Sequence, residues 1–355
     1  MTTAEDIAET PYIEFLTDDA FQDYLLQGVS RTFALTIPQL PDGLGRVVSN
    51  AYLLCRIVDT IEDEPAISAE RKRVFCDQFV GVVAGDVAAS RFAAGLYPLL
   101  SDHTLAAEKE LIEKTPRVIA ITRTFNAAQR QALESCVRIM SRGMAEFQEN
   151  SDIRGLSRLE EMDRYCYHVA GVVGEMLTKL FCDYSPEIAA HHDALMKLSV
   201  SFGQGLQMTN ILKDMWDDRG RGACWLPRDV FARAGFDLGE LAPGHYQEAF
   251  GRGLTQLIAV AHGHLRNAIT YTLLIPAHET GIRSFCLWAI GMAILTLRKI
   301  NKHKDFVTGN QVKISRRSVK ATILATRVTV GSDHMLRSLF NLAGRGLPLA
   351  STHEG

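Results

Sequence analysis

Two stretches of this 355-residue chain place carboxylates at helical spacing, and each has a cation within one turn. The first is YLLCRIVDTIEDE, residues 52–64, and the second is NILKDMWDDRGRGACW, residues 210–225. On a helix, residues separated by three, four, seven and eleven positions share a face, so each stretch predicts one polar stripe. The stripes consist of Tyr52, Arg56, Asp59 and Asp63, with Glu62 beside them, and of Gln207, Asn210, Asp214 and Asp218.

The chemistry that suits these stripes is the binding of a magnesium diphosphate. Carboxylates that face each other across a cleft repel unless a divalent cation joins them, and Mg²⁺ takes one or two carboxylates together with phosphate oxygens. Neither stretch has the glycine of a calcium-binding EF-hand loop, and the seven cysteines and eleven histidines show no zinc-ligand spacing. We therefore predict two facing helices that hold a diphosphate through magnesium. The alternative for each stretch is a solvated acidic helix face.

Two further segments have both a functional and a purely structural interpretation. The turn Arg219–Gly222 puts cations beside Asp218, where they either end a helix or stabilise a departing diphosphate. The expected helix from Leu159 carries small residues between apolar ones, in YCYHVAGVVG at 165–174. It predicts either tight helix packing or the wall of an apolar tunnel for a prenyl chain. At the mouth of such a tunnel, Tyr165 could act as an acid or base or stabilise a carbocation.

A basic loop near the C-terminus, residues 299–318, is either solvated or binds anions. Its six cations are Lys299, Lys302, Lys304, Lys313, Arg316 and Arg317. A phosphate-rich cofactor or an anionic membrane surface would suit them. No G-x-G-x-x-G follows a strand, which excludes a Rossmann site.

Composition limits the class and the compartment. The chain is 47% apolar and 22% charged, enough for a large core, and its net charge of −3 argues against nucleic-acid binding. The acidic N-terminus lacks a signal-peptide pattern, and the scattered cysteines indicate reduced thiols. The longest uncharged run, 284–297, is too short to span a bilayer. We expect a cytoplasmic protein with no transmembrane helix; peripheral contact with the inner face of the membrane stays open.

Helical periodicity dominates, and strand signals are nearly absent. We predict an all-α, single-domain architecture over residues 1–343, with about ten helices around a central apolar cavity, and a disordered tail over 344–355. The expected helices include 44–63, 105–124 and 316–341, whereas residues 219–246 are expected to be irregular.

Four blocks, in this order, resemble the squalene/phytoene synthase family: SRTFALTIPQLP at 30–41, DTIEDE at 59–64, YCYHVAGVVG at 165–174 and QMTNILKDMWDDRGRGACWLP at 207–227. The resemblance implies the α-helical isoprenoid synthase fold and head-to-head condensation of two prenyl diphosphates. It implies that magnesium diphosphate is bound by Asp59, Glu62, Asp63, Asn210, Asp214 and Asp218. Tyr165 matches the family tyrosine assigned to proton and cation chemistry, and we expect Tyr52 and Arg221 near it.

The stretch TLRKINKHKDFVTGNQVKIS, residues 296–315, looks like the C-terminal block of the family's reductive branch. That likeness implies NADPH near Arg31, Arg56, Asn210 and Lys313, with Arg316 adjacent. The expected reaction joins two farnesyl diphosphates to presqualene diphosphate and reduces it to squalene. The alternatives are a non-reductive synthase that makes dehydrosqualene or phytoene, and a non-catalytic relative that acts as an interaction protein.

Overall fold

The computed structural model describes residues 16–30, 32–149 and 152–349. This part of the chain is helical, with one isolated bridge between Leu156 and Pro227 and no strand, so the predicted all-α class is confirmed. The chain divides into two compact units, Met1–Arg142 and Gly143–Gly355, and the boundary falls within helix α8 (Ala127–Glu149). Each unit is described by itself. The single domain and the central cavity stay predictions.

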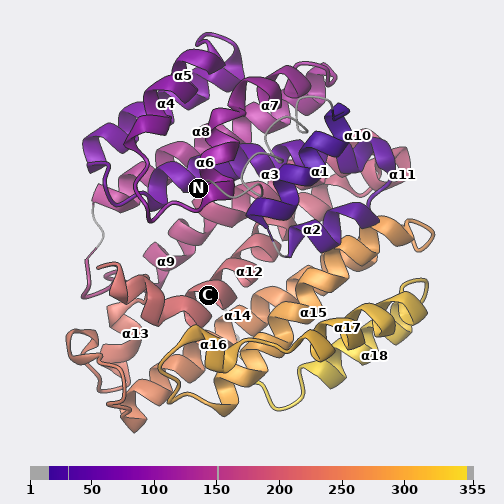
Figure 1. Ribbon diagram of the computed structural model, residues 1–355. Coiled ribbons are helices and arrows are strands. Elements are labelled where there is room, and N and C mark those ends of the chain that lie inside the picture. Colours follow the sequence, from indigo (N-terminus) through magenta and orange to yellow (C-terminus); the bar gives the residue numbers. More distant parts are fainter. Residues whose placement is uncertain (1–15, 31, 150–151, 350–355) are drawn as a thin grey trace, which may run out of the picture. The chain divides into compact units, whose positions relative to one another are not determined.

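The first unit is built around α3, the helix that carries the first acidic stripe (Figure 1). Its helices are α1 (Asp18–Val29), α2 (Phe33–Thr36), α3 (Asp42–Asp63), α4 (Ala69–Ala84), α5 (Ala89–Leu96), α6 (Ala106–Glu113), α7 (Thr115–Thr122) and the first part of α8, with 3-10 turns at Ile37–Gln39 and Tyr97–Leu99. Helix α3 packs against α1, α4, α6 and α7. The helix expected over 105–124 is therefore two helices. Pro116 explains the break, because it has no N–H and its ring clashes with the preceding turn.

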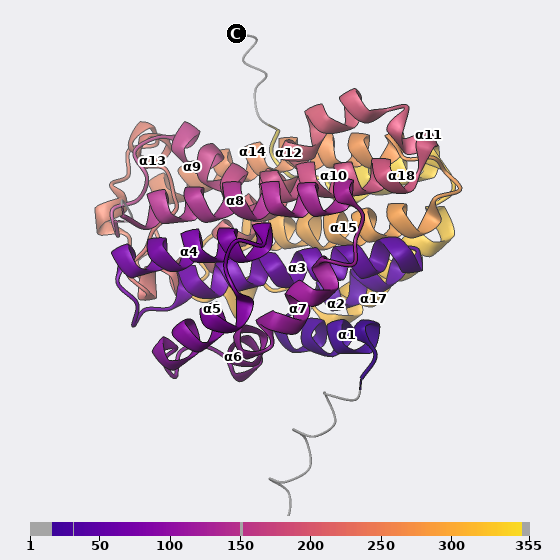
Figure 2. The ribbon, with the colours of Figure 1, turned by 90° about the horizontal axis from the view of Figure 1, so that it is seen from above.

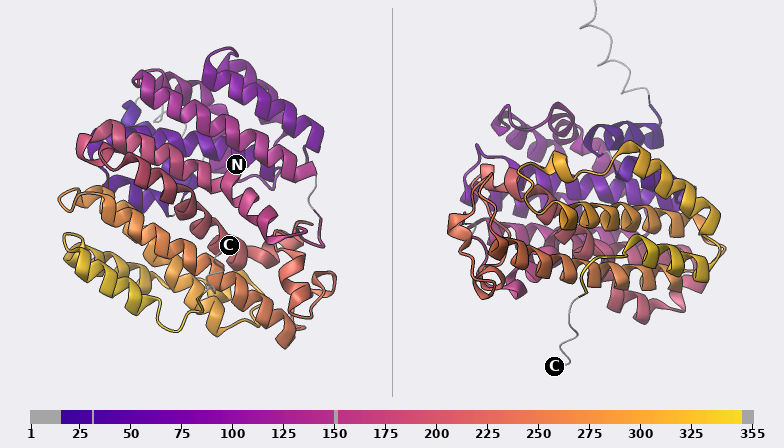
Figure 3. Two further views of the ribbon diagram at one scale, coloured as in Figure 1. Left: turned by 180° about the vertical axis from the view of Figure 1, so that it is seen from behind. Right: turned by 90° about the horizontal axis from the view of Figure 1, so that it is seen from below.

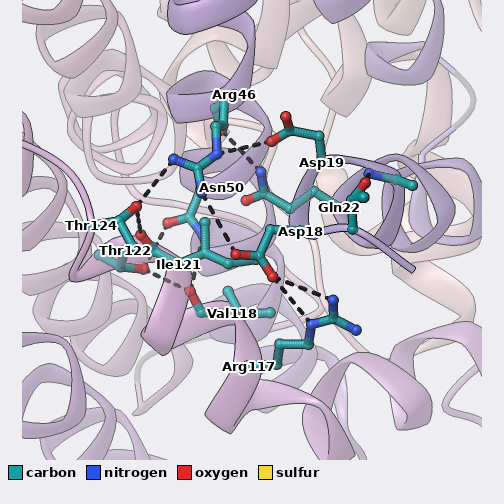
Figure 4. A network of polar contacts seen from close by, with 12 residues as sticks. Asp18, Asp19, Gln22, Arg46, Asn50, Arg117, Val118, Ile121, Thr122 and Thr124 are labelled. Atoms are coloured by element: carbon teal, nitrogen blue, oxygen red, sulfur yellow. Dashed lines mark hydrogen bonds and ion pairs between the residues drawn. The ribbon is translucent and has the colours of Figure 1, made fainter. Parts of the chain in front are cut away.

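A polar network fastens α3 to α1 and α7 (Figure 4). Asn50 is fully buried; its side chain donates to the Val118 carbonyl at 3.0 Å and accepts from the Thr122 hydroxyl at 2.7 Å. Arg46 donates to Asp19 at 2.8 Å and to Thr124 at 3.1 Å. Because buried polar groups are costly when unpaired, these bonds fix the position of α3 in its unit.

The second unit contains long helices that run side by side, α12 beside α14 and α14 beside α15 (Figures 1 and 3). Its helices are α9 (Leu159–Cys166), the π-helix η4 (Tyr167–Gly171), α10 (Val172–Tyr184), α11 (Pro186–Ala189), α12 (His192–Gly220), α13 (Arg228–Arg233), α14 (Glu248–Leu274), α15 (Thr280–Lys302), α16 (Gly309–Val312), α17 (Arg316–Thr329) and α18 (Asp333–Ala343), with a 3-10 turn at Leu238–Glu240. A shared cluster of buried apolar side chains joins α9, α12, α13, α14, α15, α16 and α18.

Three sequence expectations for this unit need correction. The helix expected over 316–341 is broken between α17 and α18, where the Ser332 hydroxyl accepts from the Met335 amide and so begins a new helix. Helix α13 lies in the region expected to be irregular, 219–246. The first part of the tail, expected to be disordered, is packed as far as Pro348: Leu347 is buried, and His262 Nδ1 lies 3.0 Å from the Pro348 carbonyl oxygen. Residues 350–355 lie outside the described residues.

Helix α15 contains the long apolar run and is long and apolar enough, by length and composition alone, to cross a membrane. However, 72% of its most apolar window is buried inside the protein. Figure 2 shows α15 among the other helices of its unit. This burial is typical of a core helix.

Candidate active site

The first acidic stripe lies on α3 with the predicted periodicity. From Ala51 to Asp63 every residue is buried except Tyr52, Arg56, Asp59 and Asp63. These four are separated by four, three and four positions, so they form the one face of this part of α3 that is not packed into the unit. The apolar residues between them fill the core. The predicted stripe is therefore present, and tertiary packing leaves it open.

Arg56 is held between two carboxylates. Its guanidinium forms an ion pair with Asp59, Nη1 to Oδ2 3.6 Å, and a second one with Glu108 on α6. Burial lowers the pKa of Arg56, but Asp59 and Glu108 together hold it above its ordinary value. Asp59 remains poorly hydrated: burial raises its pKa to about 7, against the opposite pull of Arg56, although 27% of its side chain is exposed. Desolvation, helped by the charges of Asp63 and Glu108, thus outweighs the pull of Arg56 on the Asp59 carboxylate.

The end of α3 is anchored by residues that the sequence did not single out. The ammonium group of Lys72, buried on α4, donates to the Glu62 carbonyl oxygen. Glu64 is 1% exposed and accepts hydrogen bonds from the Ser101 amide at 2.8 Å and hydroxyl at 2.6 Å, from the Thr104 hydroxyl and from the Ala66 amide at 2.9 Å. Burial alone would raise the pKa of Glu64, but these bonds lower it to about 2. This anchoring fixes the direction in which α3 ends, immediately after Asp63.

Tyr52 begins the stripe and lies beside Phe33, with ring centroids 5.1 Å apart. Its hydroxyl donates to the Val29 carbonyl oxygen at 3.3 Å, and burial raises its pKa. Tyr52 is therefore a protonated donor, four residues before Arg56. Its predicted neighbour Tyr165 lies in the other unit.

The second acidic stripe lies on α12 and is more open. Asn210 is exposed, the Asp214 side chain is 37% exposed, and only Asp218 is buried. Lys213 links the first two: its Nζ is 3.1 Å from Asp214 Oδ2 and 3.3 Å from Asn210 Oδ1. Arg221, as predicted, lies beside Asp218, Nη2 to Oδ1 2.6 Å. Cations from the same helix and the turn after it therefore accompany this stripe.

Part of the C-terminal block packs directly onto the second stripe. Helix α16 contacts α12, and the Trp216 indole N–H donates to the Phe306 carbonyl oxygen at 2.7 Å. A Cβ placed on Gly309 would lie 3.1 Å from the Lys213 carbonyl oxygen and 3.2 Å from Asp214 Oδ1. Only a residue without a side chain fits here unchanged. The sequence singled out the cations of this block and missed the role of its glycine.

Tyr165 is buried at the end of α9, in an aromatic cluster. Its ring is stacked on Trp225, with centroids 4.0 Å apart and planes 6° apart, and meets the edge of Phe147 at 5.3 Å. A π-helix follows immediately, a local distortion that occurs frequently at functional sites. The stack joins the end of α9 to the segment that follows the second stripe. Trp225 thus anchors the turn by packing.

Two residues before Tyr165, Asp163 is a feature that the sequence did not reveal. Its Oδ1 is buried and has no hydrogen-bond partner among the described residues, and its backbone carbonyl accepts from Gln204 at 3.1 Å. Burial, reinforced by Glu160, raises its pKa to about 6. A carboxyl group in this state keeps its proton in mildly acidic solution, up to about pH 6.

The small residues after Tyr165 serve helix packing. A Cβ on Gly174 would lie 2.2 Å from the Ser199 carbonyl oxygen, and one on Gly203 would lie 2.1 Å from the Ala170 carbonyl oxygen. Helix α12 thus approaches α10 and η4 backbone to backbone. Of the two interpretations left open, the structure supports tight packing at these positions.

The residues predicted to bind NADPH differ in whether the structure describes them and in how exposed they are. Arg31 lies outside the described residues. Lys313 is exposed, its carbonyl oxygen accepting from Lys299 at 2.6 Å, and Arg316 begins α17. Lys313 follows α16 directly and so lies one short helix away from Gly309 and the second stripe.

The donor set of both stripes fits magnesium, because it consists of carboxylate and amide oxygens with few other ligands nearby. Among the described residues, no three His, Cys, Asp or Glu side chains come close enough to form a metal site by themselves. Mg²⁺ does not require such a group, since phosphate oxygens and waters complete its shell. The ligands within each stripe are arranged as predicted along one helix face. Their meeting across a cleft stays a prediction.

A model of the squalene/phytoene synthase family matches residues 26–318. The chain belongs to this family. It is 26% identical to the squalene synthase of Eremothecium gossypii over 321 aligned residues. The alignment covers 89% of this chain and 70% of that protein. To the squalene synthase of Gibberella zeae it is 28% identical over 292 residues, 81% of this chain and 59% of that protein.

The fold is that of solved members of the family. The structure of TcSQS with the ligand BPH1237 superposes with a TM-score of 0.73 at 22% identity, over 92% of this chain and 91% of that one. At this identity the likeness concerns the fold. It agrees with the isoprenoid synthase architecture expected from the four sequence blocks.

Proposed function

We propose that this protein is a squalene synthase. In the first step two farnesyl diphosphates form presqualene diphosphate, with release of one diphosphate and one proton. In the second step the remaining diphosphate leaves and a hydride from NADPH completes squalene. The observation that carries this proposal is the packing of the reductive-branch block onto the second acidic stripe, through Gly309 and Trp216. The named relatives support it.

The chain's carboxylates would hold magnesium, which, when bound, neutralises the diphosphate and makes it a better leaving group. On α3 the ligands would be Asp59, Glu62 and Asp63. On α12 they would be Asn210, Asp214 and Asp218. We propose that the two stripes face each other across the substrate site.

Cations of the chain would complete the diphosphate site. Arg221 is paired to Asp218, and Lys213 bridges Asn210 and Asp214, so both would lie beside the diphosphate and stabilise the charge that develops as it departs. The Arg221 side chain is 61% exposed, so a diphosphate could reach its guanidinium from solvent.

The aromatic cluster would serve the hydrocarbon part of the reaction. The ring of Tyr165, stacked on Trp225, presents a π surface that stabilises an allylic cation. The carboxyl group of Asp163, two residues earlier, would add a buried acid near this cluster, with a pKa raised to about 6 by burial. Tyr52 would take part from α3 as a hydrogen-bond donor.

NADPH would meet cations of both units: Arg31 and Arg56 from the first, and Lys313 and Arg316, together with the amide of Asn210, from the second. The Arg56 guanidinium already pairs with Asp59 and Glu108, so its contribution would be to hold Asp59 in place as well as to attract phosphate. Lys313 and Arg316 are exposed and suit the phosphates of the cofactor directly.

The decisive experiment is a product assay. Purified protein is incubated with farnesyl diphosphate and Mg²⁺, with and without NADPH, and the extracted products are identified by gas chromatography and mass spectrometry. We expect squalene only with NADPH, and presqualene diphosphate without it. A product that is the same with and without NADPH would reject the reductive reaction in favour of a dehydrosqualene or phytoene synthase.

We also propose a cytoplasmic location. All seven cysteines are free thiols, six of them buried, as suits a reducing compartment. Cell fractionation with detection of the protein tests this: recovery from the periplasm or the medium would contradict it.

A further inference from the structure

Helix α17 has an exposed face on which apolar and basic side chains alternate. Its exposed residues are Arg316, Arg317, Lys320, Ala321, Leu324, Arg327 and Val328. They recur at spacings of three and four, so they form one stripe along the helix. The opposite side packs on α15 (Figure 3, right). There the Thr322 methyl would meet a Cβ on Gly291, and Thr326 is buried.

The apolar members of this stripe are unusually exposed. Val328 is 71% and Leu324 is 66% exposed, the two highest values among the large hydrophobic side chains of the described residues. They lie four positions apart, one turn of helix, with Ala321 completing the row. An apolar row flanked by polar residues marks an interaction surface more often than a single exposed side chain does.

The cations of the stripe have no acidic partners. Helix α17 contains no Asp or Glu, and Arg317, Lys320 and Arg327 form no ion pair within the described part of the chain. Residues 298–349 contain eleven Lys or Arg but only two Asp or Glu, in a chain whose net charge is −3. The positive charge is therefore concentrated in the region that displays the apolar row.

We propose that α17 is the surface by which this protein lies on an anionic lipid bilayer. Leu324 and Val328 would enter the boundary between headgroups and acyl chains, while Lys320 and Arg327 would contact lipid phosphates, as in interfacial amphipathic helices. A second copy of the chain is a poorer occupant, because two such stripes would bring unpaired cations together. The stripe also lacks the aromatic side chains on which single-stranded nucleic acids stack. The proposal does not depend on the product of the reaction.

Vesicle flotation tests this directly with the full chain. The vesicles are phosphatidylcholine, either alone or with about one third phosphatidylglycerol, a content that gives a negative surface potential. We expect binding to the anionic vesicles, little binding to the neutral ones, and a loss of binding between about 50 mM and 500 mM NaCl as the charges are screened. Equal binding to both kinds of vesicle, or to neither, would overturn the proposal.

Two double variants separate the charge from the apolar contact. Lys320→Glu with Arg327→Glu should weaken anionic binding by about tenfold or more, since each basic residue near the surface contributes substantially. Leu324→Ser with Val328→Ser should weaken it by roughly tenfold through loss of insertion. The matched control is Arg71→Glu with Val74→Ser, an exposed cation and an exposed apolar residue on α4, which should bind like the unchanged protein.

The variants must keep their fold, which thermal unfolding checks, and should turn over farnesyl diphosphate normally without vesicles. If a charge-reversed variant unfolds, Lys320→Gln with Arg327→Gln replaces it, with a smaller expected loss of binding. Unchanged vesicle binding in both stripe variants would refute the proposal. A dimer in gel filtration that only the stripe variants dissociate, without vesicle binding, would refute it in favour of a contact between copies.

Discussion

The two acidic stripes have the same spacing but very different surroundings. On α3 (Asp42–Asp63) Glu62 is buried and Asp59 partly so, and distant elements supply the partners: Glu108 from α6, Lys72 from α4. On α12 (His192–Gly220) Asp218 is buried and Asp214 is partly exposed, and their cations come from the same helix and the turn after it. The first stripe is thus positioned by tertiary structure, the second by local sequence. We expect the first to tolerate substitution of its supporting residues less well.

The largest effect should come from the ligands themselves. Asp59→Asn and Asp214→Asn should each lower kcat/KM by about 10²- to 10³-fold, because each removes charge that holds the magnesium diphosphate. The folds should survive, since Arg56 keeps Glu108 and Lys213 keeps Asn210. Steady-state kinetics and thermal unfolding measure both.

The matched control for these ligands is Asp193→Asn, an exposed carboxylate at the start of α12. It should leave the rate unchanged. Full activity in a protein that combines Asp59→Asn with Asp214→Asn would show that the stripes are not the catalytic site.

The anchor at the end of α3 should give the next largest effect. Glu64→Gln replaces an acceptor of four hydrogen bonds by a side chain with one acceptor oxygen, so it should lower the free energy of unfolding by about 2 to 3 kcal/mol, roughly 3 to 4 °C in Tm. Glu70→Gln, exposed on α4, is the control and should change Tm by little. A Tm for Glu64→Gln equal to that of the control would mean that this end of α3 needs no anchor.

Substitution of Asp163, the buried carboxylate of the second unit, should raise the free energy of unfolding instead of lowering it. In the folded protein the pKa of Asp163 is about 6, above its ordinary value of 3.8. The group therefore stabilises the fold fully below pH 3.8, and this contribution is lost as pH rises through 6. Asp163→Asn should therefore raise the stability at pH 7.5 by about 1 to 2 kcal/mol and leave it unchanged near pH 4.

Thermal unfolding over this pH range measures the effect of Asp163→Asn, and its activity profile shows whether the proton also matters in the reaction. Equal stabilisation at both pH values would assign the effect to packing instead. A drop in stability at pH 7.5 would indicate that the carboxylate has a favourable partner.

The smallest effect is expected from a substitution at the close contact between α16 and α12. Gly309→Ala would press a methyl group on the Lys213 carbonyl and on Asp214, so we expect a few-fold loss of kcat/KM and a stability change of about 1 kcal/mol or less. Gly331→Ala, with no atom within 4 Å of the new Cβ, is the control. If both variants behave alike, the close contact of α16 has no bearing on activity.

Much of the site could be predicted because helical spacing alone decides which residues share a face. The stripe of Tyr52, Arg56, Asp59 and Asp63 emerged as predicted, and so did the pairing of Arg221 with Asp218. Residues far apart in the chain could not be paired in this way. Nothing in the spacing of Glu108 or Ser101 relates them to α3, because the loops between them set that distance.

The sequence by itself determined the helical class, the family and the two rows of carboxylates, since these depend on periodicity and on the order of short motifs. Only the tertiary structure decided which carboxylates are buried, which are anchored and which lie unpaired. Burial depends on what packs against a helix, and the solvation of a charge depends on burial. Asp59, Glu64 and Asp163 are acidic residues of the same kind in the sequence, yet packing makes the pKa of the first about 7, that of the second about 2 and that of the third about 6.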